Sequence, residues 1–375
     1  MDVQCNATLC ALVKIAFRTD ASLQIGIGHV MRCLTLADAL TAEGAECHFI
    51  GREHAGNLIE YVRSKGYATH SLPILEVADT KLAHSHWLGS TQVQDAEGCA
   101  PILAKLQPDW LVVDHYALDA QWESSLAQHY RNLMVIDDLA DRAHECQLLL
   151  DQTFGRAADD YRAWVPSDCR LLCGSTYALL RPEFAELREY SLQRRTTHRL
   201  KHLFINMGGV DKDNVTSSVL DALRHTPLPH DCEITVVMGA TSPWLDEVKE
   251  LAAAMPWDTT VQVGVSNMAQ LMADSDLAVG AAGATSWERC CLGLPTAMIV
   301  LAENQRYAAT LLAKAGAARM LTLEDQFLEQ FGGLIDEITR SPSCLIKLSR
   351  GAEGVTDGMG SQRVGANMLR ETVNE

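Results

Sequence analysis

The segment FRTDASLQIGIGH, which ends at His29, contains residue types suited to proton transfer. An apolar run leads into it and an amphipathic stretch follows, so we expect it to join the first strand to the first helix. His29 would then lie in the first turn of that helix. There the positive end of the helix dipole favours a neutral imidazole that can accept a proton.

An isolated histidine more often caps a helix or packs beneath a loop. Here Gly26 and Gly28 open the backbone beside His29, which favours a role in chemistry. We therefore take His29 as the candidate base, with Arg18, Asp20 and Gly28 as candidate substrate-binding residues. The segment lacks the third glycine of a dinucleotide-binding fingerprint.

Two glycine-containing turns in the second half are candidates for phosphate binding. Gly208 and Gly209 follow the apolar run LFINM, and Gly283 precedes Thr285 and Ser286. Free backbone amides at such turns bind phosphate groups. Glycine pairs after strands are common, so the first turn alone is a weak signal.

Glu288 follows the second of these turns by one helical turn, in the segment GATSWE. At this position a carboxylate can accept hydrogen bonds from both hydroxyls of a ribose. The alternative is a capping box, in which Glu288 serves only the start of its helix.

Short apolar runs alternate with amphipathic stretches along the whole chain, which is typical of α/β folds with mostly parallel sheets. In the first half the runs predict strands at 13–18, 46–50, 110–114, 133–137 and 147–151, with helices at 30–43 and 58–66. In such sheets ligands bind beyond the carboxyl ends of the strands, where Asp20 and Asp114 are expected.

The charged stretch 185–201 interrupts this rhythm and predicts a linker. Further strands are predicted after it at 202–206, 233–238, 260–263, 277–281 and 296–300. We therefore predict two Rossmann-like domains, 12–184 and 202–375, which face each other across a cleft. The terminal helix is expected to cross back to the first domain.

The formal net charge of −17 argues against nucleic acid or an anionic membrane as a partner, since either would repel the chain. The 12 cysteines are scattered without the spacing of a disulfide framework or a zinc site. No apolar run approaches the roughly 20 residues of a membrane helix, and the start lacks a basic signal-peptide region. We expect a cytoplasmic monomer in which residues 1–11 form an extension.

The run from Gly280 to Pro295, with Asn304 and Gln305 downstream, resembles the nucleotide-binding segment of GT-B glycosyltransferases, in particular the peptidoglycan N-acetylglucosaminyltransferases. That resemblance implies that Glu288 holds the ribose of UDP. It also implies that the turn at Gly283 meets the diphosphate.

The chain from about Val13 to Ala318 resembles the UDP-2,4-diacetamido-2,4,6-trideoxy-β-L-altropyranose hydrolases of pseudaminic acid biosynthesis. The matching segments occur in the family's order and are FRTDASLQIGIGHVMRCLTLADAL, LVVDHYALD, VIDDLADRAHECQLLLDQ, LLCGSTYALLRPEF and INMGGVDKDNV. The resemblance implies that His29 is the base and that Tyr116 and Asn304 lie near the substrate.

The activity implied is attack of water on C1 of the sugar with inversion, without a cofactor, in a pathway that can supply flagellin glycosylation. A glycosyltransferase, a hydrolysing epimerase and a non-catalytic UDP-sugar-binding protein are the alternatives.

We expect no metal site. His84, His86, His198 and His202 lack a third ligand at zinc-like spacing and are interpreted as surface residues. Asp137 and Asp138 could be paired carboxylates or magnesium ligands, but turn and capping roles are favoured, with Asp137 facing the cleft.

Overall fold

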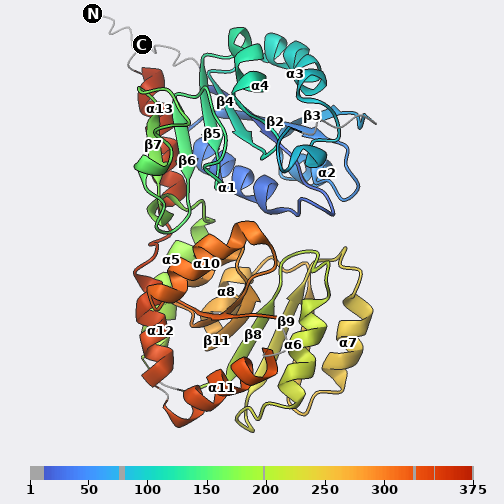
Figure 1. Ribbon diagram of the computed structural model, residues 1–375, viewed down its shortest axis with the longest axis vertical. Helices are drawn as coiled ribbons and strands as arrows, with labels where there is room; N and C mark the ends of the chain where they lie inside the picture. The colour runs from blue at the N-terminus through green and yellow to red at the C-terminus, as the bar shows by residue number, and fades with distance from the viewer. Residues whose placement is uncertain (1–11, 76–80, 197–198, 324–326, 342, 374–375) are drawn as a thin grey trace, which may run out of the picture.

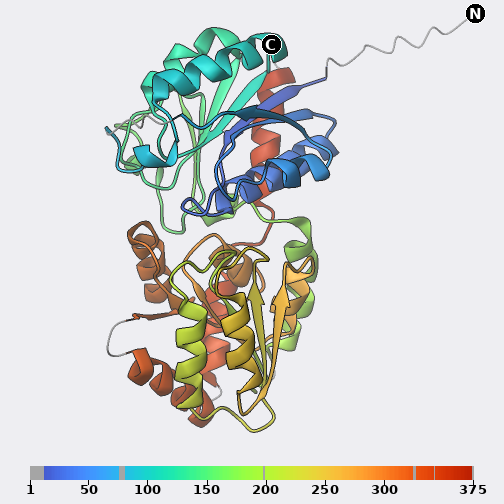
Figure 2. The same ribbon diagram turned by 90° about the vertical axis from the view of Figure 1, so that its right-hand side faces the viewer.

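A computed structural model describes residues 12–75, 81–196, 199–323, 327–341 and 343–373 (Figure 1). The expected extension 1–11 and His198 lie outside these residues. The chain forms two α/β lobes, each built on a parallel sheet with helices against it (Figures 1 and 2). Among the residues that the structure describes, no helix combines the length and apolar character needed to cross a membrane.

The first sheet has seven strands in the order β3-β2-β1-β4-β5-β6-β7. They are β1 (Lys14–Thr19), β2 (Glu46–Arg52), β3 (Ala68–Leu72), β4 (Trp110–Asp114), β5 (Asn132–Ile136), β6 (Leu148–Asp151) and β7 (Arg170–Cys173). Every residue of β4 is buried, as expected for a central strand covered on both faces.

The helices of this lobe follow the strands in a βα rhythm. They are α1 (Gly28–Ala42), α2 (Ile59–Ser64), α3 (Gln92–Leu106) and α4 (Ala120–Ser125), with short 3-10 helices η1 (Ser85–Trp87), η2 (Ala127–His129), η3 (Ala158–Asp160) and η4 (Ser175–Tyr177). Leu34, Ala37 and Leu40 of α1 face the core, as their spacing predicts.

The second sheet has six strands in the order β10-β9-β8-β11-β12-β13. They are β8 (His202–Asn206), β9 (Glu233–Met238), β10 (Asp258–Val263), β11 (Leu277–Ala281), β12 (Thr296–Ile299) and β13 (Arg319–Leu321). The helices of this half are α6 (Val215–Arg224), α7 (Leu245–Ala253), α8 (Met268–Asp274), α9 (Thr285–Cys291), α10 (Glu303–Lys314), α11 (Phe327–Arg340) and α12 (Ser343–Glu353).

Much of the stretch interpreted as a linker is helical. Helix α5 (Pro182–Arg194) starts before it and packs against α8 and α9. Its basic residues explain why: Arg188 donates to the carbonyl of Cys291, and Arg195 donates to the carbonyls of Leu292 and Ser275. The charges that resembled a solvated linker therefore satisfy carbonyl groups of the second lobe.

Helix α13 (Gly360–Val373) returns to the first lobe, where Val364 and Met368 join the core beside α1 (Figure 1). The two chain crossings between the lobes are bonded together. Ser175 donates to the carbonyl of Val355 over 2.5 Å, and Ser361 donates to the carbonyl of Leu180 over 3.0 Å.

Both sheets place their first and fourth strands side by side, the arrangement that creates a ligand site where the strand order reverses. The lobes meet at these carboxyl edges. A Cβ atom at Gly209 would lie 3.1 Å from Cδ1 of Ile27, and the Arg156 guanidinium lies 4.7 Å from the centre of the Tyr307 ring. The turns after β1 and β8 therefore face each other.

A buried ion cluster holds β1, β2 and α3 together. The guanidinium of Arg18 bonds to Asp95 over 2.6 and 3.1 Å and lies 2.8 Å from Asp20. Arg52 also donates to Asp95 over 2.6 Å, and the indole of Trp122 donates to it over 3.0 Å. With Asp95 at 0% exposure, these partners are what stabilises its charge.

We predict that Asp95→Ala lowers the free energy of unfolding by about 3–5 kcal/mol, because it leaves two buried guanidinium groups without their shared partner. Urea denaturation measures this difference. The matched control is Asp246→Ala, whose side chain is 96% exposed and pairs with Lys249 at 3.6 Å. The control should change stability by less than about 1 kcal/mol; equal losses in the two variants would contradict the assignment.

Candidate active site

His29 lies where the sequence predicts, in the first turn of α1 at the strand-order reversal of the first sheet. Its Nδ1 is 2.6 Å from Oδ1 of Asp114, the last residue of β4. A carboxylate accepts hydrogen bonds, so Nδ1 carries the proton and donates it to this contact. That tautomer leaves the Nε2 lone pair free to accept a proton.

Asp114 is an orienting residue in this geometry and not the substrate contact that the sequence predicted. Its side chain is fully buried, and both oxygens are occupied by His29 and by Arg32, which donates from Nε and Nη2 over 2.7 Å each. Burial alone raises the pKa of a carboxyl, but Arg32 and His29 outweigh it and hold the pKa of Asp114 well below its usual range. Asp114 therefore stays ionised beside the imidazole.

Tyr116 lies beside His29, with ring centres 4.7 Å apart in an edge-to-face contact. Trp87 stacks on Tyr116 at 5.7 Å, and His84 lies 4.4 Å from the Trp87 ring. The sequence interpreted His84 as a surface residue, but it is half-buried in this aromatic group. These rings shield one side of the candidate base.

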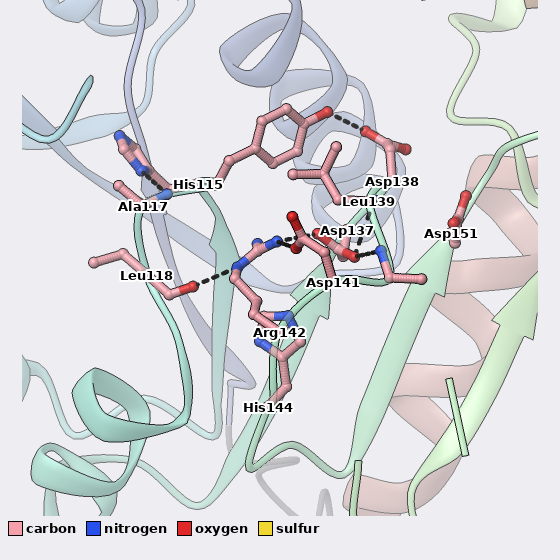
Figure 3. Close-up of polar contacts among 12 residues, drawn as sticks. His115, Ala117, Leu118, Asp137, Asp138, Leu139, Asp141, Arg142, His144 and Asp151 are labelled. Carbon is pink, nitrogen blue, oxygen red and sulfur yellow. Dashed lines mark hydrogen bonds and ion pairs between the residues drawn. The ribbon is translucent and has the colours of Figure 1, made fainter. Parts of the chain in front are cut away.

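Asp137 has the turn role that the sequence predicted, but its side chain is buried and does not face the cleft (Figure 3). Asp137 is fully buried and accepts from the backbone amide of Ala140 and from Arg142, over 2.8 and 2.7 Å. Asp138 faces the site instead. Its Oδ2 accepts from the Tyr116 hydroxyl over 2.7 Å and from Nη1 of Arg32 over 2.6 Å.

Arg18 and Asp20 lie apart from His29. Arg18 has 0% exposure and Asp20 2%, and both belong to the buried cluster of Asp95. Asp20 accepts from the backbone amide of Arg52 over 2.6 Å. Their place in the fold therefore gives them a part in holding strands together. Gly28 begins α1, and a side chain there would meet open space among the described residues.

The turn after β8 is shaped by its glycines. Gly208 adopts φ +97°, which favours glycine, and Gly209 lies against Ile27 of the first lobe. A Cβ atom at Gly239 would lie 2.0 Å from the carbonyl oxygen of Gly209, so only glycine fits there. The sequence predicted Gly208 and Gly209 but missed Gly239, which the turn needs as its neighbour.

Thr285 and Ser286 open α9 after the turn at Gly283. Arg289 donates to the Thr285 and Ser286 hydroxyls over 3.1 and 3.2 Å, and to the carbonyl of Ala281 over 2.7 Å. Both hydroxyl groups keep their own protons available as donors, since they only accept from Arg289. The capping-box alternative lacks its first member, because the N-cap of α9 is Ala284.

Glu288 lies on α9 with 17% of its side chain exposed, 3.8 Å from Arg181. Burial raises its pKa to about 7, and the nearby Arg181 only partly offsets this. Hydrogen bonds donated by the hydroxyl groups of a ligand stabilise the ionised form of such a carboxyl and so lower its raised pKa. The arrangement suits a ligand with neighbouring hydroxyls.

Asn304 and Gln305 lie in the first turn of α10. Gln305 accepts from the amide of Leu301 over 3.0 Å, and its Nε2 lies 3.8 Å from where a Cβ atom of Gly283 would be. Asn304 is exposed. Gln305 thus joins the turn at Gly283 to α10, and Asn304 remains accessible beside it.

The sequence analysis missed Arg32, and it favoured a turn role for Asp138 without foreseeing its contacts with Tyr116 and Arg32. Arg32 follows His29 by three residues, so helical geometry places both on one face, and this spacing could have revealed it. The partnership of Asp138 with Tyr116 spans 22 residues between neighbouring strands and depends on the fold. No group of three or more potential metal ligands occurs among the described residues.

Comparisons with known proteins agree with this architecture. Residues 202–359 match the glycosyltransferase family 28 C-terminal domain. The match lies within the second lobe, which is therefore similar to such a domain. The first 201 residues lie outside that match. The fold of the whole chain is of the GT-B type. MurG from Acinetobacter baumannii superimposes on it with a TM-score of 0.69 at 14% identity, covering 96% of this chain and 99% of that one.

Two further relatives are informative. The UDP-2,4-diacetamido-2,4,6-trideoxy-β-L-altropyranose hydrolase of Campylobacter jejuni is 25% identical over 304 residues, which cover 81% of this chain and 97% of that protein. The UDP-GlcNAc 2-epimerase of Neisseria meningitidis, solved with UDP-GlcNAc bound, has a TM-score of 0.60 at 12% identity, covering 96% of this chain and 99% of that one. Both matches extend over most of this chain and so include both lobes.

Proposed function

We propose that this protein is a UDP-sugar-processing enzyme that hydrolyses UDP-2,4-diacetamido-2,4,6-trideoxy-β-L-altropyranose to the free sugar and UDP, the step used in pseudaminic acid biosynthesis. The match to the Campylobacter hydrolase over most of both chains supports the substrate. The observation that carries the reaction type is the 2.6 Å contact between His29 and Asp114, which presents a free Nε2 at the facing edge of the first lobe.

In the proposed reaction Nε2 of His29 takes a proton from water as its oxygen bonds to C1 of the sugar. The bond from C1 to the diphosphate oxygen breaks, and its electron pair leaves with UDP. Asp114 stabilises the imidazolium that forms, and the configuration at C1 inverts.

The second lobe holds the nucleotide in this proposal. Glu288 accepts from the ribose hydroxyls, while the turns at Gly208, Gly209 and Gly283 and the hydroxyls of Thr285 and Ser286 bind the diphosphate. Their donors stabilise the charge that develops on the leaving group. Tyr116 and Asn304 border the sugar, one from each lobe.

We predict that His29→Ala lowers kcat by about 10²–10⁴-fold and leaves KM within a few-fold, because the lost interaction belongs to the transition state. Measurement of UDP release under steady state gives both constants. His29→Asn should be equally impaired, since an amide cannot take the proton. The control is His202→Ala, a half-exposed histidine near Glu233.

Proton NMR of the wild-type reaction identifies the product. Hydrolysis with inversion releases a free sugar with the opposite anomeric configuration, whereas an epimerised sugar, or none without an added acceptor, would favour a rival activity. Binding without turnover would favour a UDP-sugar-binding protein. Near-normal turnover by His29→Ala would move the role of base to another residue.

We predict that UDP binds more tightly as pH rises through about 7, the pKa of Glu288. Affinity rises with pH because the ribose hydroxyls donate to the ionised carboxylate of Glu288. At lower pH this carboxyl is protonated, and it must lose its proton before UDP binds. Between about pH 8 and pH 6 this group should weaken affinity roughly tenfold. Isothermal titration calorimetry measures it.

The control is Glu288→Gln, which keeps the titration of the UDP phosphate and removes that of the carboxyl. Glu288→Ala should weaken UDP binding by about 1–3 kcal/mol at the higher pH. An unchanged pH dependence in Glu288→Gln would show that the carboxyl does not contact the nucleotide.

We predict full activity in excess EDTA, because backbone amides and helix N-termini can stabilise the leaving diphosphate. UDP release before and after chelation, with magnesium or manganese added back, tests this. Activity that only a divalent ion restores would contradict the mechanism and direct attention to Asp138.

A further inference from the structure

The guanidinium group of Arg32 links two side chains of the proposed site in the first lobe, those of His29 and Tyr116. Arg32 contacts both oxygens of Asp114 over 2.7 Å each, and its remaining terminal nitrogen contacts Asp138 over 2.6 Å. Asp114 in turn bonds to His29, and Asp138 to Tyr116. All three donor nitrogens of Arg32 are therefore used, each in a fixed direction.

The planar fork of an arginine fixes geometry in a way that a lysine cannot. In this site the Nε and Nη2 atoms set the plane of the Asp114 carboxylate, and Oδ1 of that carboxylate accepts from both Arg32 and His29. The direction of the Nδ1 contact, and hence of the free Nε2, follows from this plane.

The same guanidinium orients Tyr116. Oδ2 of Asp138 accepts from Arg32 and from the Tyr116 hydroxyl, so the proton of that hydroxyl is directed to Asp138. The lone pairs of the hydroxyl are then the part available to a ligand, as acceptors for an N–H or O–H group.

Burial makes this arrangement rigid. The side chains of Arg32 and Asp114 are 7% and 0% exposed, so water does not compete strongly for their bonds. Arg32 also lies one helical turn after His29 on α1, which ties the guanidinium to the backbone that carries the base.

We propose that Arg32 is the positioning residue of the site, one guanidinium that aligns the His29 base through Asp114 and the Tyr116 hydroxyl through Asp138. The inference rests on the proposed function for its kinetic effect, and its geometric part can be tested without turnover.

The competing interpretation is a buried ion pair that only stabilises the fold. The protein offers an internal comparison in Arg52, which is 2% exposed and bonds to Asp95 and to the carbonyl of Pro73 in the other buried cluster. An arginine that serves only stability should behave like Arg52 when it is replaced by lysine.

The kinetic test compares Arg32→Lys with Arg52→Lys in the full-length protein. Misplacement of a base by about 1 Å can reduce the rate on the order of 10²-fold, so Arg32→Lys should lower kcat about 10–100-fold while the Kd for UDP stays within about two-fold. Arg52→Lys should lower the unfolding midpoint and leave kcat unchanged at a temperature where it is folded.

A double-mutant cycle separates alignment from general destabilisation. Arg32→Lys combined with Asp114→Asn should lose less than the product of the two single losses, because the path through Asp114 to His29 is shared and only the path through Asp138 to Tyr116 is separate. Losses that multiply, or an Arg32→Lys kcat near that of the wild type, would overturn the proposal.

The geometric test uses proton NMR of the unliganded protein. A low-field signal from the Nδ1 proton of His29, assigned by its loss in Asp114→Asn, should be present in the wild type and in Arg52→Lys, and lost or shifted in Arg32→Lys. If the wild type releases no UDP but the signal responds in this way, the hydrolase assignment fails and the positioning role stands. An unchanged signal in folded Arg32→Lys would overturn that role.

Discussion

A carboxylate that has no contact with water must be stabilised entirely by its neighbours, and the Asp114 carboxylate imposes this requirement on the first lobe. It lies at the end of the central strand β4, where the strand order reverses, and α1 supplies the compensating groups. His29 and Arg32 meet this need from one face of that helix. The position of the candidate base is thus a consequence of how one buried charge is accommodated.

The two lobes contribute different kinds of groups to the proposed site, charged side chains in the first and backbone groups in the second. The first concentrates side-chain ion pairs around Asp114 and Asp138, whereas the second presents glycine turns and helix starts, with the partly buried Glu288 on α9. Under the proposed function, this difference explains how a chain of net charge −17 binds an anionic UDP-sugar. The favourable field comes from backbone dipoles and inward-facing arginines, and the acidic surface discourages larger polyanions.

The sequence was sufficient for the fold class, the ten strands it predicted and the segments that surround the site. The strands it missed, β3, β7 and β13, are edge strands, where half-exposed residues weaken the apolar signal. The sequence analysis gave Arg18 as a candidate substrate-binding residue and did not foresee its bonds to Asp95, because these join residues 77 positions apart in the chain. The turn role of Asp137 was predicted correctly, but the expectation that it faces the cleft was wrong, because the turn after β5 buries its carboxylate.

The paired chain crossings have a mechanical consequence. Residues 175–180 and 355–361 pass between the lobes side by side and are joined by the bonds from Ser175 and Ser361. A single tether allows swinging and twisting alike, but two tethers bonded together resist torsion and leave bending about one axis as the compliant motion. The paired crossings therefore restrict relative movement of the lobes to bending about one axis, which keeps α1 opposite the same turn of the second lobe.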